Sequence, residues 1–163
     1  MKKTRSPLAY VYLSLFIITS TAIIIFASLS GEVSSEQSST LLNIVVKITT
    51  IFKINLSQTQ LDGLHLFIRK AIGHFGIFLL DGAFALLSIH YWTGLKTRTK
   101  FVVALSTGIF IAGLSEVIQM LAPNRGPAIG DVIIDFFGFF VGTVIVYWLL
   151  NLTSQKQNKK IRK

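Results

Sequence analysis

Residues 116–135, EVIQMLAPNRGPAIGDVIID, place carboxylates and an arginine between two long apolar runs. Carboxylates can act as general acids or bases, and their oxygens can hold a divalent cation. An arginine beside them can form an ion pair or hold an anionic group of a ligand. The side chains of this stretch that could do chemistry are Glu116, Gln119, Arg125, Asp131 and Asp135.

A second polar group interrupts the apolar stretch FIRKAIGHFGIF, residues 67–78. His74 could transfer protons near neutral pH or bind a ligand, or it could be a hydrogen-bonded histidine within a helix bundle. Arg69 and Lys70 could anchor a helix at a membrane interface or clamp an anionic head group. Asp81 follows His74 by seven residues on the same helical face, and it could pair with His74, be neutral or contact water.

The composition indicates a membrane protein with a single domain, 1–163. The chain is 52% hydrophobic and 14% charged, whereas a soluble domain carries about 25% charged residues. It has no cysteine, which excludes disulfides and thiolate metal sites. The net charge of +9 is concentrated at the termini and in one short loop, which favours membrane lipid over nucleic acid as the partner.

Four apolar stretches are long enough to cross a bilayer core, which takes about 20 helical residues. We therefore predict an all-α membrane protein, a four-transmembrane-helix bundle. The first apolar run is longer than that of a signal peptide, so we expect a retained helix. The predicted spans are 8–29, 71–92, 101–121 and 128–150.

The basic residues predict the orientation. Lysine and arginine concentrate before the first span, between the second and third spans, and in the tail 151–163. Cytoplasmic segments carry this excess, so we expect a cell-membrane protein with both termini cytoplasmic. The loop 30–70 is then extracytoplasmic.

This loop predicts two further features. Its opening, SGEVSSEQSS, is expected to be flexible, and STLLNIVVKITTIFKI predicts a short amphipathic helix. That helix could lie on the outer membrane surface or over the mouth of the bundle. Asn55 or Ser57 could start another helix that runs into the second span. The apolar face of the amphipathic helix would hold Leu41, Val45, Ile48 and Phe52.

Orientation brings the polar residues of three spans into one layer, the outer third of the membrane. Glu116 and Gln119 are three residues apart, and Asp131 and Asp135 are four apart, so each pair shares a helical face. A charged side chain at a helix centre costs about 2.5–3.5 kcal/mol on insertion scales. We therefore expect these groups to face one another, a cavity or a ligand.

Small residues predict how the helices pack, and a turn is predicted between the third and fourth spans. Gly138 and Gly142 form a GxxxG pattern, which predicts close helix packing. The turn between the third and fourth spans is predicted from Pro123, Asn124, Gly126 and Pro127.

Residues 115–142 resemble the signature of the VanZ-like family of bacterial membrane proteins, and FIRKAIGHFGIF resembles the family's second motif. The resemblance covers nearly the whole chain. It implies four membrane spans and a link to teicoplanin-type glycopeptide resistance, without a settled biochemical activity. Ile77 and Phe78 stand where many members have a glutamate and an aromatic residue. The matching residues are Glu116, Gln119, Arg125, Asp131, Asp135, Gly138 and Gly142 in the first motif and Arg69, Lys70, His74 and Phe75 in the second.

Several functions fit this pattern. The first is binding of an amphiphile, such as a lipoglycopeptide antibiotic, a lipid or a lipid-linked cell-wall precursor, at the outer leaflet. The others are an intramembrane enzyme, a structural polar network that fixes helix packing, and a small transporter. The candidate binding residues are Arg69, Lys70, His74, Glu116, Gln119, Arg125, Asp131 and Asp135. The candidate catalytic residues are His74, Glu116, Asp131 and Asp135, with a divalent metal as the possible cofactor.

Overall fold

The computed structural model describes residues 6–126 and 128–161, and over these residues it contains helices and no strand. Four helical segments are long and apolar enough to cross a membrane: α1, the continuous segment α3–η1–α4, α5 and most of α6. This confirms the predicted all-α class with four spanning helices. The elements are α1 (Pro7–Ser28), α2 (Gly31–Ile51), α3 (Gln58–Ile68), η1 (Arg69–Gly76), α4 (Ile77–Trp92), α5 (Thr97–Leu121) and α6 (Ile129–Ile161).

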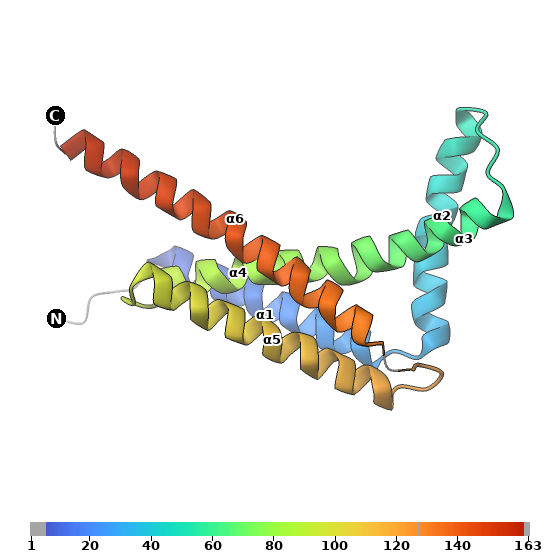
Figure 1. Cartoon of the computed structure of the whole chain (residues 1–163), viewed down its shortest axis with the longest axis horizontal. Coiled ribbons are helices and arrows are strands. Elements are labelled where there is room, and N and C mark those ends of the chain that lie inside the picture. Colours follow the sequence, from blue (N-terminus) through green and yellow to red (C-terminus); the bar gives the residue numbers. More distant parts are fainter. Residues whose placement is uncertain (1–5, 127, 162–163) are drawn as a thin grey trace.

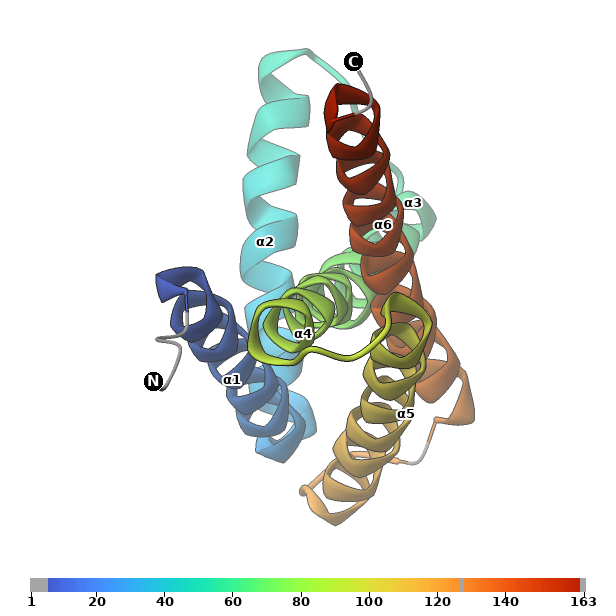
Figure 2. The ribbon, with the colours of Figure 1, turned by 90° about the vertical axis from the view of Figure 1, so that its left-hand side faces the viewer.

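Helix α4 is the centre of the bundle. It contacts α1, α5 and α6, which surround it in the end-on view of Figure 2. Helix α2 runs across one end of the bundle, roughly at right angles to the spanning helices (Figure 1). The start of α1 and the end of α6 lie at the opposite end.

Glycines let the backbones of α6 and the central helix touch. A Cβ atom on Gly138 would strike the carbonyl of Phe75, and one on Gly142 would strike the carbonyl of Leu79. Such contact requires residues without side chains, as in other small-xxx-small helix pairs of membrane proteins. The close approach fixes α6 against η1 and α4 at a single register.

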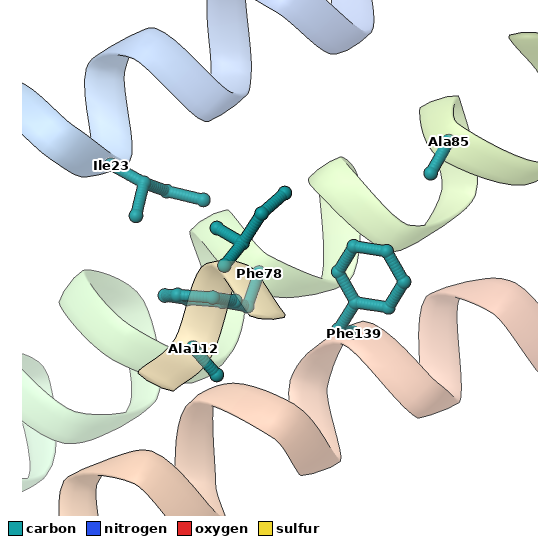
Figure 3. Packing of buried hydrophobic residues seen from close by; sticks show 6 residues of the cluster. Ile23, Phe78, Ala85, Ala112 and Phe139 are labelled. Atoms are coloured by element: carbon teal, nitrogen blue, oxygen red, sulfur yellow. The ribbon is translucent and has the colours of Figure 1, made fainter. Parts of the chain in front are cut away.

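A small apolar core fills the space between the four spanning helices. Phe139 of α6 is fully buried and lies close to Ala85 of α4, with Phe78 and Ala112 beside it (Figure 3). Ile23 of α1 closes the cluster on its other side. Many of the bundle's outward-facing side chains are exposed isoleucines, valines and phenylalanines, as expected for a lipid-facing surface.

The aromatic residues with polar tips mark one interface. All four tyrosines and both tryptophans fall at the end of the bundle that holds the chain termini. Tyr12 stacks on Tyr91 with ring centroids 5.3 Å apart, and Tyr10 meets Trp92 edge-on. Tyrosine and tryptophan concentrate at membrane–water interfaces, so this end of the bundle has the composition of an interfacial belt.

The second span is longer than predicted. Residues 71–92 form only the last part of a helical segment of 35 residues, Gln58–Trp92. It begins at Ser57, which forms a capping box with Gln60. At 1.5 Å per residue the segment is about 52 Å long, so roughly 20 Å of it extends beyond a 30 Å bilayer core.

The prediction of a flexible segment at the start of the loop was wrong. Residues 31–40 form the first half of α2, a helix of 21 residues rather than a short one. Its start is capped by Ser30 and held by a distant turn, because the carbonyl of Pro123 accepts from Gly31 N at 3.0 Å. Asn124 adds a bond to Glu32 at 3.0 Å. Apolar residues in the second half of α2, including Ile44 and Ile48, are exposed.

The basic loop between the second and third spans is also shorter than predicted. Helix α5 begins at Thr97, so Lys100 is helical and buried. Its ammonium donates to the carbonyl of His90 at 3.3 Å, near the end of α4, where a cation is favourable. Other predicted positions lie outside the described residues: Lys2, Lys3, Arg5, Pro127, Arg162 and Lys163, with the side chains of Lys156, Lys159 and Lys160.

The glycine contacts predict opposite changes in thermal stability for two glycine-to-alanine substitutions. Gly142→Ala should lower the thermal stability of the purified protein in detergent, because overpacking costs about 1–3 kcal/mol. Gly113→Ala should raise it slightly, because that helical position has open space and alanine is favoured by about 0.5–1 kcal/mol. Thermal unfolding followed by circular dichroism measures both. Equal shifts for the two variants would contradict the backbone contact.

Candidate functional site

Helix η1 presents basic groups to the carboxylates of α6. Lys70 Nζ lies 2.8 Å from Asp131 Oδ1, and His74 Nδ1 lies 3.0 Å from Asp135 Oδ1. His74 Nε2 is 3.8 Å from Asp131 Oδ2. The imidazole therefore stands between two carboxylates, as the predicted convergence of these helices requires. η1 is a π-helix, a rare conformation that often occurs at functional sites.

These groups are withdrawn from the surface. Asp135 is fully buried, and His74 and Asp131 are buried as well. The hydrogen bond to Asp135 fixes the orientation of the imidazole ring. One oxygen of Asp135 is satisfied by His74, whereas its Oδ2 is buried without a hydrogen-bond partner. The site thus holds one carboxylate oxygen that could accept a further donor.

Glu116 connects α5 to the start of α6. Its Oε1 accepts a hydrogen bond from the backbone N–H of Ala128 at 2.5 Å. A carboxylate is favourable at a helix N-terminus because the first N–H groups there have no partner within the helix. Gln119, one turn along α5, is buried and turns toward a cavity that Glu116 does not line. The two residues predicted to share a face therefore have different surroundings.

Arg125 reaches from the α5–α6 turn to the end of α1. Its Nη1 donates to the carbonyls of Phe26 and Ala27, each at 3.3 Å, and its Nε is buried without a partner. Burial lowers the pKa of Arg125, and the like charge of Arg69 acts in the same direction, while Asp131 and Glu116 oppose them. Arginine nevertheless stays charged in proteins.

A cavity of about 510 Å³ lies where α2 crosses the bundle. Serines and Gln37 of α2 contribute to its lining, and a contact of 2.7 Å between Ser38 Oγ and His65 Nε2 ties α2 to α3 beside it. The predicted residues that line it are Arg69, His74, Gln119, Arg125 and Asp135. Its apolar lining includes Ile23, Phe26, Leu41, Ile68, Ile72 and Phe78.

The two halves of α2 have different surroundings. The first half, which was predicted to be flexible, covers the cavity, whereas the second half, which holds most of the predicted amphipathic helix, exposes apolar residues. Sequence reasoning did not identify the residues of α2 that line the cavity. Their serine-rich composition is typical of a loop, whereas in the structure the segment is a helix capped by Ser30 and bonded to a distant turn.

Asp81 belongs to a separate cluster deeper in the bundle. Its Oδ1 accepts hydrogen bonds from Thr19 at 2.5 Å and from Ser20 at 2.9 Å, while its Oδ2 is buried without a partner. These hydroxyls, rather than His74, are its partners in the structure. The polar triplet at residues 19–21, within an otherwise apolar span, was the signal in the sequence that could have predicted them.

Two groups of site residues contrast most clearly, while His74, Arg125 and Asp135 both bond within the protein and line the cavity. Lys70, Glu116 and Asp131 bond to other parts of the protein and do not line the cavity. Arg69 and Gln119 line the cavity, and their side chains form no hydrogen bond or ion pair within the described residues. Among residues 6–126 and 128–161, no three histidine or carboxylate groups are placed to hold a metal ion, so the geometry adds no support for a metal site.

A double-mutant cycle tests the pairing of the first group. Lys70→Met should destabilise the protein because it leaves the buried carboxylate of Asp131 without its ammonium partner. The double variant Lys70→Met/Asp131→Leu should lose less stability than the two single losses together, by about 1 kcal/mol. Unfolding in detergent with increasing denaturant measures each loss. Additive losses would show that the two side chains do not interact.

Comparison with known proteins agrees with the resemblance found in the sequence. The VanZ/LLP1 family model matches residues 10–151, which include all four spanning segments in large part. No curated protein and no solved structure matches the chain. The family match covers both groups of site residues and the glycines that hold α6 in place. The chain belongs to the VanZ/LLP1 family.

Proposed function

We propose that this protein binds an amphiphile in the cavity beneath α2. The observation that carries the proposal is the mixed lining of that cavity, which joins apolar side chains to charged ones. Ligand sites of this kind are mostly apolar with a few polar groups that fix orientation. Arg69 and Arg125 would contact the head group, and the apolar wall would take part of the tail.

We place the cavity at the outer leaflet of a bacterial cell membrane, with both termini in the cytoplasm. The excess of basic residues in the terminal segments and around the α4–α5 connection supports this orientation. The course of α2 across the bundle also supports it, since the exposed Ile44 and Ile48 would face the membrane interface. A lipoglycopeptide antibiotic, a lipid and a lipid-linked cell-wall precursor all combine a polar head with a long apolar part. Binding of any of them could affect glycopeptide susceptibility or envelope homeostasis.

A second candidate function is catalysis on such a ligand. The observation that favours it is the bond between His74 and the buried Asp135, because a carboxylate on one ring nitrogen orients an imidazole for proton transfer. Water would be the attacking group. In this case His74→Gln should abolish turnover while the protein still retains the ligand.

Filling the cavity tests the binding proposal. Gly73 lines the cavity, and a Cβ atom there would meet no atom within 4 Å. Gly73→Phe should therefore leave the fold intact and block the ligand. Lipid retained by the detergent-purified protein, quantified by mass spectrometry per mole of protein, should fall several-fold.

The matched control is Gly113→Phe, which makes the same change on α5 at another open position outside the cavity. It should retain as much lipid as the original protein. If Gly73→Phe retains the same lipid as this control, the cavity is not the binding site. Circular dichroism establishes that both variants keep their helices.

Cysteine labelling tests the orientation, and the chain has no native cysteine to interfere. Gly126→Cys lies in the α5–α6 turn and Gly94→Cys in the α4–α5 connection, and both glycines have open surroundings. A membrane-impermeant maleimide should label position 126 on intact cells and position 94 only after permeabilisation. The reverse pattern would overturn the outer-leaflet placement.

A further inference from the structure

We propose that the head group bound in this cavity is the phosphate of a phospholipid, held between Arg69 and Arg125. This inference rests on the proposed function and names the class of its ligand. It also excludes Lys70 from the head-group site, although the sequence alone places Lys70 beside Arg69 with the same expected role.

Several charged groups near the cavity are already matched within the protein. Lys70 is matched by Asp131 at 2.8 Å, and Asp135 bonds to His74 at 3.0 Å. Glu116 bonds to the start of α6. Two charged side chains of the cavity wall, Arg69 and Arg125, form no ion pair within the described residues.

The two arginines reach the cavity from different elements. Arg69 belongs to η1, and Arg125 belongs to the turn between α5 and α6. Hydrogen bonds from Arg125 Nη1 to the end of α1 fix its guanidinium in place, and its Nε remains buried without a partner. Like charges that face one cavity repel each other, so an anion between them would relieve both the repulsion and the missing hydrogen bond.

A phosphate fits two guanidinium groups better than a single carboxylate does. A phosphodiester spreads its charge over two oxygens and offers further acceptors on its ester oxygens, so it can face two planar forks at once. Gln119 and Ser115 line the same wall and could add weaker contacts. These hydrogen-bond donors could hold a phosphate without a metal ion.

The surroundings favour a lipid phosphate over free phosphate. Ile68 and Ile72 continue from Arg69 along η1 and the end of α3, and Phe26 faces them from α1. Both Ile72 and Phe26 are also exposed on the outer surface of the protein. An acyl chain could therefore run from the head group past these residues into the surrounding lipid. Free phosphate has no apolar part that could contact them.

Three lipids with identical dioleoyl chains test the inference on the full-length protein in detergent. They are phosphatidylglycerol with an anionic phosphate, phosphatidylcholine with a phosphate and a cation, and diacylglycerol without phosphate. Native mass spectrometry titrations should give the order phosphatidylglycerol, phosphatidylcholine, diacylglycerol, with about a tenfold affinity difference between the first and last. Inorganic phosphate at millimolar concentration should not displace phosphatidylglycerol.

Charge-removing variants assign the effect to the arginines. Arg69→Gln should weaken phosphatidylglycerol binding about tenfold and leave diacylglycerol binding unchanged. Arg125→Gln should act in the same direction, but it also loses the bonds to α1, so Arg69→Gln decides the question if Arg125→Gln does not fold. Lys47→Gln is the matched control, because it removes a cation from an exposed position on α2 outside the cavity.

The outcomes separate this inference from the proposed function. Equal binding of the three lipids, or an Arg69→Gln variant that still prefers phosphatidylglycerol, would overturn the phosphate site and leave amphiphile binding intact. Displacement by inorganic phosphate would show a site for the free ion and overturn the lipid assignment. Failure of all three lipids to bind would also overturn the phospholipid assignment, while the comparison of Gly73→Phe with Gly113→Phe decides the proposed function separately.

Discussion

The backbone contact between α6 and the central helix sets the position of nearly every polar group in this protein. Gly138 touches Phe75 and Gly142 touches Leu79, so the two helices run in the same direction with a fixed offset. The ion pairs repeat at a constant offset of their own, since 61 residues separate Lys70 from Asp131 and His74 from Asp135. A slip of one helical turn, about 5.4 Å, would break both pairs at once and force side chains into the backbone. Packing and ion pairing therefore specify the same register, which makes the arrangement unambiguous.

This dependence changes how the charged residues of the family motifs should be interpreted. Carboxylates and basic groups inside a membrane suggest an active site, yet Lys70, Asp131 and Glu116 are each bonded to another helix or to its end. These bonds stabilise the closure of α5, α6 and η1 around α4, which is the role expected of a structural polar network. The residues left for a ligand are those that line the cavity without such bonds, Arg69 and Gln119 above all. A loss of function in a variant of Asp131 would therefore not by itself identify a binding residue.

The sequence predicted the features that depend on local pattern. Span lengths follow from apolar runs, and the shared faces of Asp131 and Asp135 follow from helical spacing. It did not predict features that depend on distant contacts. The start of α2 bonds to Pro123 in a distant turn, and the partners of Asp81 lie on α1, 61 and 62 residues away. The π-helical turn of η1 was not predicted either. Its apolar and polar residues fit an ordinary α-helix equally well, so the local pattern does not distinguish the two.

The location of the unmatched charges gives the strongest physical reason to place function beneath α2. A charge in the middle of the bilayer is costly, and the structure pairs the charges on η1 and α6 that lie within the bundle. Arg69 and Arg125 are unmatched by any ion pair within the described residues, and both line the cavity to which α2 supplies hydroxyl groups. Two cations kept partly buried and unpaired would destabilise a protein that gained nothing from them. An anion that occupies the space between the two guanidinium groups for much of the protein's lifetime would offset this destabilisation.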